Sequence, residues 1–169
     1  MSDVIKKFGQ IVGNSIERHP ERARGLLKLG YAYSGFQMKR LPKKHLLPNQ
    51  VYSSVECNRA IRYLLSSPEN SAVVNIFFPC ELLHAAGIRP AFVEGFSGYI
   101  NGAFCERYFI DYIENVGMPK TLCSYHKTLL GTAFSGVLPK PKFVMFTTMV
   151  CDANMITFRA LADFWNIPL

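Results

Sequence analysis

Cys151 is the residue of this chain whose setting most favours chemistry. It follows an apolar run, Phe143 to Val150, whose Phe, Val, Met and Thr residues predict a buried strand. Apolar residues recur at helical spacing after it, and Asp152 is the predicted N-cap of that helix. A helix N-terminus favours the thiolate, which is the form of cysteine that binds a metal or attacks an electrophile. Cys151 is therefore a candidate metal ligand or nucleophile.

Cys123 is predicted to have the same setting. Residues 120–122 are expected to lead into it as the end of a strand would, and residues 124–134 can form a helix. In open α/β sheets, ligands bind outside the carboxyl ends of the strands. The thiols of Cys123 and Cys151 are therefore expected to lie at one edge of a sheet and to face a common crevice.

The elements before this region predict a helical N-terminal arm over residues 1–66. Gly30, Gly35 and the basic stretch 39–45 are expected to form a loop or linker in this arm. Pro20 suits the first position of a helix, where its missing N–H costs nothing. Three helices are expected in the arm: residues 4–16, Pro20 to Tyr31, and residues 49–66.

The remaining residues, 67–169, predict an α/β domain. Gly95, Gly98 and Gly102 are expected to mark a loop. Strands that alternate with helices imply a parallel sheet with helices on its faces, so we expect a flavodoxin-like fold. The expected strands are residues 72–78, 91–93 and 143–150, and the expected helices are residues 80–86, 103–116, 124–134 and 153–165.

The composition is that of a globular chain whose charge is unevenly distributed along the sequence. Of its 169 residues, 49% are hydrophobic and 18% are charged, which excludes a disordered chain. The net charge of +7 comes from the arm, since residues 1–62 hold 12 Lys and Arg against 4 Asp and Glu. No nucleic-acid-binding motif accompanies these scattered cations, so we do not expect nucleic acid as a partner. We interpret these cations first as a solvated face of the protein. The second interpretation is that they bind a phosphate-bearing ligand or a protein partner.

The five cysteines predict a reducing environment. Their number is odd, and no Cys-x-x-Cys pair occurs, which argues against a disulfide framework. The first residues, MSDVIKKFG, lack the apolar core of a secretory signal, and no apolar run approaches the ~18 residues of a membrane helix. We therefore expect a cytoplasmic protein without a membrane segment.

The stretch from Phe78 to Pro90, FPCELLHAAGIRP, carries a resemblance to a known family. Its Pro-x-Glu-Leu, Ala-Ala-Gly and final Pro resemble the signature of the 2-hydroxyacyl-CoA dehydratase family, which includes the D-component of 2-hydroxyglutaryl-CoA dehydratase and the benzoyl-CoA reductase subunits. Leu122-Cys123-Ser124, with Lys127 downstream, resembles the first cluster cysteine of that family. Val150-Cys151-Asp152-Ala153, after an apolar strand, resembles the second. The resemblance covers roughly residues 72–165.

The resemblance implies an iron–sulfur enzyme. Family members hold a [4Fe–4S] cluster with three cysteines and leave one iron open to an acyl-CoA substrate. An ATP-dependent activator protein supplies one electron, a ketyl radical anion forms, and the 2-hydroxyl group leaves to give an enoyl-CoA. By this resemblance, Cys123 and Cys151 are metal ligands and Glu81 lies near the substrate as a catalytic residue. The third cysteine of the family lies in a second α/β domain that is not present in this chain, and a sister subunit or a homodimer is the expected assembly.

Other interpretations stay open. A benzoyl-CoA-reductase-like subunit would use the same electron input on an aromatic ring, and a cluster-free interaction or scaffold fragment would dock onto a full-length homologue. Taken singly, a free cysteine is more often a core residue than a ligand. Glu81 can equally be a first-turn acid that the helix dipole favours. We expect His126 and Lys127 to be solvated.

Overall fold

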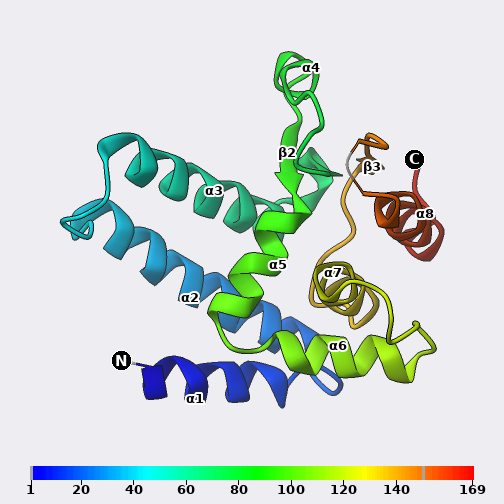
Figure 1. The fold of residues 1–169 in the computed structure, drawn as a ribbon, viewed down its shortest axis with the longest axis horizontal. Helices are drawn as coiled ribbons and strands as arrows, with labels where there is room; N and C mark the ends of the chain where they lie inside the picture. The colour runs from blue at the N-terminus through cyan, green and yellow to red at the C-terminus, as the bar shows by residue number, and fades with distance from the viewer. Residues whose placement is uncertain (1, 150) are drawn as a thin grey trace.

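The computed structural model describes residues 2–149 and 151–169 (Figure 1). It confirms an α/β architecture in which a helical N-terminal region precedes a small parallel sheet. No helix among the described residues is long and apolar enough to cross a membrane. The elements in chain order are α1 (Ser2–Gly13), α2 (Pro20–Arg40), α3 (Pro48–Ser66), η1 (Pro68–Asn70), β1 (Ser71–Val74), α4 (Glu81–Ala85), β2 (Arg89–Phe92), α5 (Val93–Gly102), α6 (Glu106–Asn115), α7 (Ser124–Phe134), β3 (Phe143–Met145) and α8 (Ala153–Trp165).

Three helices build the N-terminal region, as predicted, but α2 is longer than expected. Pro20 and Pro48 each stand in the first turn of their helices, where a proline needs no N–H partner. The expected loop around Gly30 and Gly35 was wrong, because α2 continues through both glycines to Arg40. A Cβ at Gly30 would lie 2.8 Å from the Phe8 ring, so this glycine serves close packing of α1 on α2 rather than a turn.

The sheet has three parallel strands in the order β2-β1-β3. This is the order of the first three strands of a flavodoxin-like sheet. All four residues of β1 are buried, because β1 is the central strand and helices cover the sheet.

The expected strand over 72–78 is shorter in the structure, since β1 ends at Val74 and residues 76–78 form a turn. The expected strand over 143–150 is also shorter: β3 ends at Met145, and Val150 lies outside the described residues.

One predicted loop is a helix. Residues 95, 98 and 102, expected to mark a loop, all lie in α5. Val93, Phe96 and Ile100 are almost fully buried and form one apolar helical face, which outweighs the low helix propensity of glycine. The helix starts directly after β2, so the second strand ends at Phe92 and does not reach Val93.

The helical arm and the α/β region share one core. Buried side chains from both form a single cluster that includes Leu27, Ile61, Phe109 and Phe158. Arg24 adds a polar link, since its guanidinium donates to the carbonyl oxygens of the turn after α7 at 2.6 and 3.0 Å. The arm therefore packs as part of the body that positions α7 and α8 (Figure 1).

Candidate functional site

Cys123 occupies the N-cap position of α7 and is exposed. Its carbonyl oxygen accepts the backbone N–H of Lys127 at 3.0 Å, as in a regular first turn. The expected strand before it was wrong, because residues 120–122 form a turn closed by a Leu122 N–H to Pro119 carbonyl bond of 3.1 Å. The start of the helix over Ser124–Phe134 is as predicted. The thiol thus stands at a helix start, at the end of a turn and not of a strand.

Lys127 holds this turn in place from inside the protein. The expectation that it would be solvated was wrong, since the residue is only 5% exposed. Its ammonium donates to the Glu114 carboxylate of α6 at 2.6 Å and to the Lys120 carbonyl oxygen at 3.0 Å. This hydrogen bond lowers the pKa of Glu114 below its ordinary value, and the positive charges of Lys127, Lys120 and Arg107 act in the same direction. The pair thereby fastens the turn that leads into Cys123 to α6 and α7.

Ser97 fastens the same end of α7 from another side. Its hydroxyl, on α5, donates to the Tyr125 carbonyl oxygen at 2.9 Å, and Thr128 donates to the Ser124 carbonyl oxygen at 2.8 Å. Both bonds involve the first turn of α7, next to Cys123. Hydrogen bonds to α5, to α6 and within α7 therefore fix the position of this turn.

Cys151 lies between β3 and α8 and is partly buried. Asp152 occupies the N-cap position of α8, as predicted, but its side chain makes no capping hydrogen bond and its backbone is already helical. Asn75, just after β1, anchors the segment before the cysteine: its amide accepts the Thr147 N–H at 3.0 Å and donates to the Thr147 hydroxyl at 3.1 Å. The end of the central strand is thus tied to the segment that carries Cys151.

His126 connects the two cysteine-bearing helix starts. It lies in the first turn of α7, and its Nε2 is 3.6 Å from the Cys151 sulfur while its Nδ1 is 2.9 Å from the Thr157 hydroxyl of α8. The expectation that His126 would be solvated was also wrong, since it is 7% exposed. Burial lowers the pKa of His126, so the imidazole is neutral at neutral pH. Figure 1 shows α7 beside α8, and this contact joins them at the Cys151 end.

The donor chemistry of this site suits an iron–sulfur cluster, but the number of donors falls short. Thiolates are the ligands of such clusters, and Cys123 and Cys151 supply two. Among the described residues, no group of three or more His, Cys, Asp or Glu side chains is arranged to hold a metal ion. Cys105 is fully buried, and burial raises its pKa to about 12, which is the signature of an inert core thiol. The described residues therefore do not form a complete cluster site.

Glu81 begins the short helix α4 and is exposed. Figure 1 shows α4 projecting beside the start of β2, apart from α7. The geometry is that of a first-turn acid, which the helix dipole favours. Its catalytic role stays a prediction.

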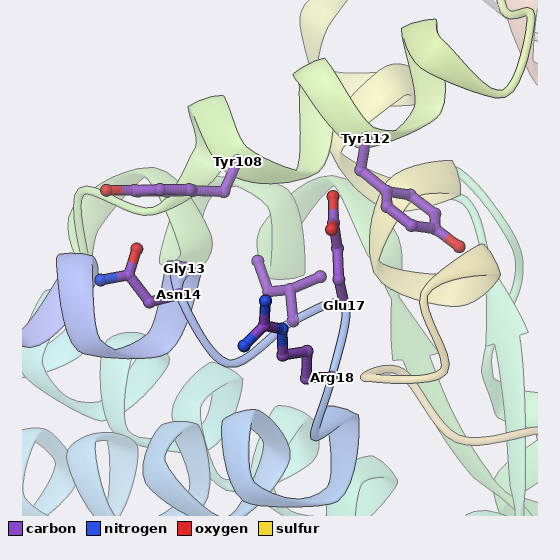
Figure 2. Close-up of a pocket in the computed structure, with 7 residues that line it drawn as sticks. Gly13, Asn14, Glu17, Arg18, Tyr108 and Tyr112 are labelled. Atoms are coloured by element: carbon purple, nitrogen blue, oxygen red, sulfur yellow. The ribbon is translucent and has the colours of Figure 1, made fainter.

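A separate small pocket lies away from both cysteines. Figure 2 shows it between the end of α1 and α6, with the Tyr108 ring above Gly13 and the Glu17 carboxylate pointing toward α6 between Tyr108 and Tyr112. Its volume is about 240 Å³, and a Cβ at Gly13 would lie 2.4 Å from the Tyr108 ring. The pocket lies where Gly13 approaches Tyr108, and none of the candidate ligands lines it.

The thiols should differ widely in reactivity. In native protein without metal, iodoacetamide should modify exposed Cys123 first and Cys105 last. With its pKa near 12, Cys105 carries about a thousandfold less thiolate at pH 8 than an ordinary cysteine, and it is also inaccessible. Mass spectrometry of peptides after timed labelling measures both rates. Equal rates for the two residues would contradict the burial of Cys105.

Acid should weaken the packing of α7 on α8. Because the folded pKa of His126 lies below its ordinary value of 6.5, the unfolded chain takes up a proton that the folded chain refuses. Stability is therefore unaffected above about pH 6.5 and falls as pH drops through 6.5 toward the folded pKa. Urea unfolding at several pH values should show this loss in the wild type. His126→Gln, which cannot titrate, should show a smaller loss over the same interval, and an unchanged slope would contradict this assignment.

Comparison with known families agrees with the resemblance seen in the sequence. A family model described as 2-hydroxyglutaryl-CoA dehydratase, D-component, matches residues 75–169. This region is more than half of the chain and contains Glu81, Cys123 and Cys151. The comparison finds no match among curated proteins or among solved structures. The helical arm lies outside the matched region.

Proposed function

Because the chain belongs to the 2-hydroxyglutaryl-CoA dehydratase D-component family, we propose that it is an iron–sulfur subunit of a 2-hydroxyacyl-CoA dehydratase-type lyase. One observation carries this proposal: in the region that matches the family, Cys123 is exposed and Cys151 is partly buried, and they precede the neighbouring helices α7 and α8. The His126 contact with Cys151 supports it, since it links the starts of α7 and α8. We also propose that the protein is located in the reducing cytoplasm.

Cys123 and Cys151 would be two of the protein ligands of a [4Fe–4S] cluster. Further ligands would come from another segment of the assembly, in a sister subunit or a second copy of the chain. Met149 and Ile156, on either side of Cys151 in the sequence, are 57% and 60% exposed, and such a partner would cover them.

The cluster would supply a single low-potential electron, delivered by an ATP-hydrolysing activator protein, and an open iron for the substrate carbonyl oxygen. The net reaction is loss of water from a 2-hydroxyacyl-CoA to give a 2-enoyl-CoA. It is redox-neutral, so the electron is recovered after each turnover. Glu81 would orient the substrate or move a proton while the hydroxyl group leaves, which requires α4 to approach the site in the assembly.

The chain's own residues would position the ligands. Lys127 and Ser97 hold the first turn of α7, and Asn75 holds the segment before Cys151. His126 lies against the Cys151 sulfur, where its neutral ring would exclude water from one side of the ligand. The basic arm would meet the phosphates of coenzyme A.

Iron and sulfide analysis of anaerobically prepared assembly, with a visible absorption spectrum, tests the proposal. Wild type should contain iron and sulfide and show charge-transfer absorption. Cys151→Ser should lose the cluster, because a serine hydroxyl is harder and holds its proton more tightly than a thiol. Cys57→Ser, on α3, is the matched control and should keep it. A colourless wild type, or full cluster content without Cys151, would contradict the ligand assignment and favour a scaffold role.

Activity assays with activator, ATP and a 2-hydroxyacyl-CoA examine Glu81. Glu81→Gln keeps size and removes charge, so cluster content should be unchanged while turnover falls, typically by about 10²–10⁴-fold for a lost acid–base group. Full activity would make Glu81 a helix-start acid only. Turnover of benzoyl-CoA in place of the hydroxyacyl substrate would favour the reductase-like alternative.

A further inference from the structure

A groove runs along the seam between α2 and α3, outside the region that matches the family. Its volume is about 740 Å³, within the range of small-molecule sites. Small residues of α2, Ala32 and Gly35, create the hollow. A Cβ at Gly35 would lie 2.5 Å from the Asn58 Oδ1 of α3, so the two helices cross closely beneath the groove.

The groove has a strong excess of positive charge. Lys39, Arg59 and Arg62 line it, and Glu56 is the single acid among the lining residues. Arg59 reaches Glu56 at 3.7 Å in an exposed pair, which contributes little stability. Lys39 and Arg62 form no ion pair with a described residue. Two cations are thus available to an anion.

Flat ring surfaces accompany these cations. Phe36 is 59% exposed at the groove, so its ring is accessible to a ligand. The Tyr63 ring also lines it, and the Arg89 guanidinium lies over that ring at 4.8 Å from its centre. The buried Asn58 amide nitrogen has no hydrogen-bond partner of normal length and angle, although it lies near the Tyr99 hydroxyl.

We propose that this groove binds a phosphorylated nucleoside, with the phosphates at Lys39 and Arg62 and the base against Phe36 or Tyr63. Cations without partners recognise phosphate, and exposed aromatic faces stack on a planar base. The site is separate from the cysteines. Its coenzyme A form rests on the function proposed above, and its free-nucleotide form does not. A free nucleotide and the nucleotide end of coenzyme A have the same chemistry, and they are the two sources of such a ligand.

Calorimetric titration of the full chain with ADP, coenzyme A, adenosine and pyrophosphate tests the site. ADP should bind, and adenosine and pyrophosphate should each bind at least about tenfold more weakly, because each keeps only half of the contacts. Lys39→Ala/Arg62→Ala should weaken ADP binding by about tenfold or more. Glu56→Gln should strengthen it, since it removes the competing acid. Tighter binding of coenzyme A than of ADP identifies the coenzyme as the source, and tighter binding of ADP identifies a free nucleotide.

Lys7→Ala/Lys142→Ala is the matched control, because it removes the same charge from exposed positions away from the groove. It should leave ADP affinity within about twofold of wild type. Thermal melts of all variants confirm that they fold. Equal loss of affinity in the control and groove variants would overturn the proposal. So would pyrophosphate binding as tightly as ADP, or no binding of either nucleotide at millimolar concentration.

Discussion

Glu114→Ala should lower the melting temperature by roughly 10 °C, because it leaves the buried Lys127 ammonium without an anion. The two partners are not equivalent. The Lys127 side chain is 6% exposed and the Glu114 side chain 18%, so only the carboxylate can turn toward water when its partner is removed. Lys127→Met should therefore be milder than Glu114→Ala. Differential scanning calorimetry of both single variants measures the difference.

A double variant tests the cause. Lys127→Met/Glu114→Leu replaces the pair with apolar groups of similar size and should melt above Glu114→Ala, since no charge is then left buried. Because Lys127 lowers the pKa of Glu114 from its ordinary 4.5, the pair also contributes stability that is complete above pH 4.5 and lost as pH falls. A double variant that melts below Glu114→Ala would show that packing, and not the charge, dominates at this position.

Gly131→Ala should destabilise the chain by an amount near the upper end of the ~1–3 kcal/mol range for overpacking. A Cβ at this position would lie 2.2 Å from the Phe109 carbonyl oxygen of α6, and a backbone atom in a helix cannot move aside alone. The gain in helix propensity of about 1 kcal/mol offsets only part of this cost. Urea unfolding gives the free energy of unfolding directly.

Gly25→Ala is the matched control, in the interior of α2. A Cβ there would meet no atom within 4 Å, so only the helix propensity changes and the variant should gain up to about 1 kcal/mol. The same chemical change is thus expected to act in opposite directions at two helical glycines. Equal effects at both positions would contradict the close contact of α6 and α7.

Much of the helical structure could be predicted from periodicity. The bounds of α7 were predicted to the residue, and Pro20 opens α2 as expected. Glycine caused the main errors, at Gly35 and Gly95 for example. Both lie inside helices, where a Cβ would meet Asn58 Oδ1 at 2.5 Å and the Phe92 ring at 2.1 Å. A glycine kept for close approach looks the same in a sequence as a glycine kept for a turn.

The candidate site could be predicted only in part. The cysteines precede helices as expected, since strong local patterns define α7 and α8. The burial of the polar residues around them was missed, because each is buried with a partner distant in sequence: His126 with Thr157, and Lys127 with Glu114. A polar side chain in an otherwise apolar helix gives no local indication of such a partner. Three successive buried polar residues in α7, residues 126–128, are the one pattern that could have raised the question.

The segment after α8 also covers the outer edge of β3, which is an edge strand of the sheet. Asn166, in the left-handed conformation at the end of α8, turns the chain back, and the Pro168 carbonyl oxygen accepts the Val144 N–H of β3 at 3.1 Å. An unpaired edge strand invites pairing between molecules, and aggregation often begins there. A strand from a neighbouring molecule could therefore pair with β3 at Val144 only after this segment had detached, so the segment protects β3 against edge-to-edge association.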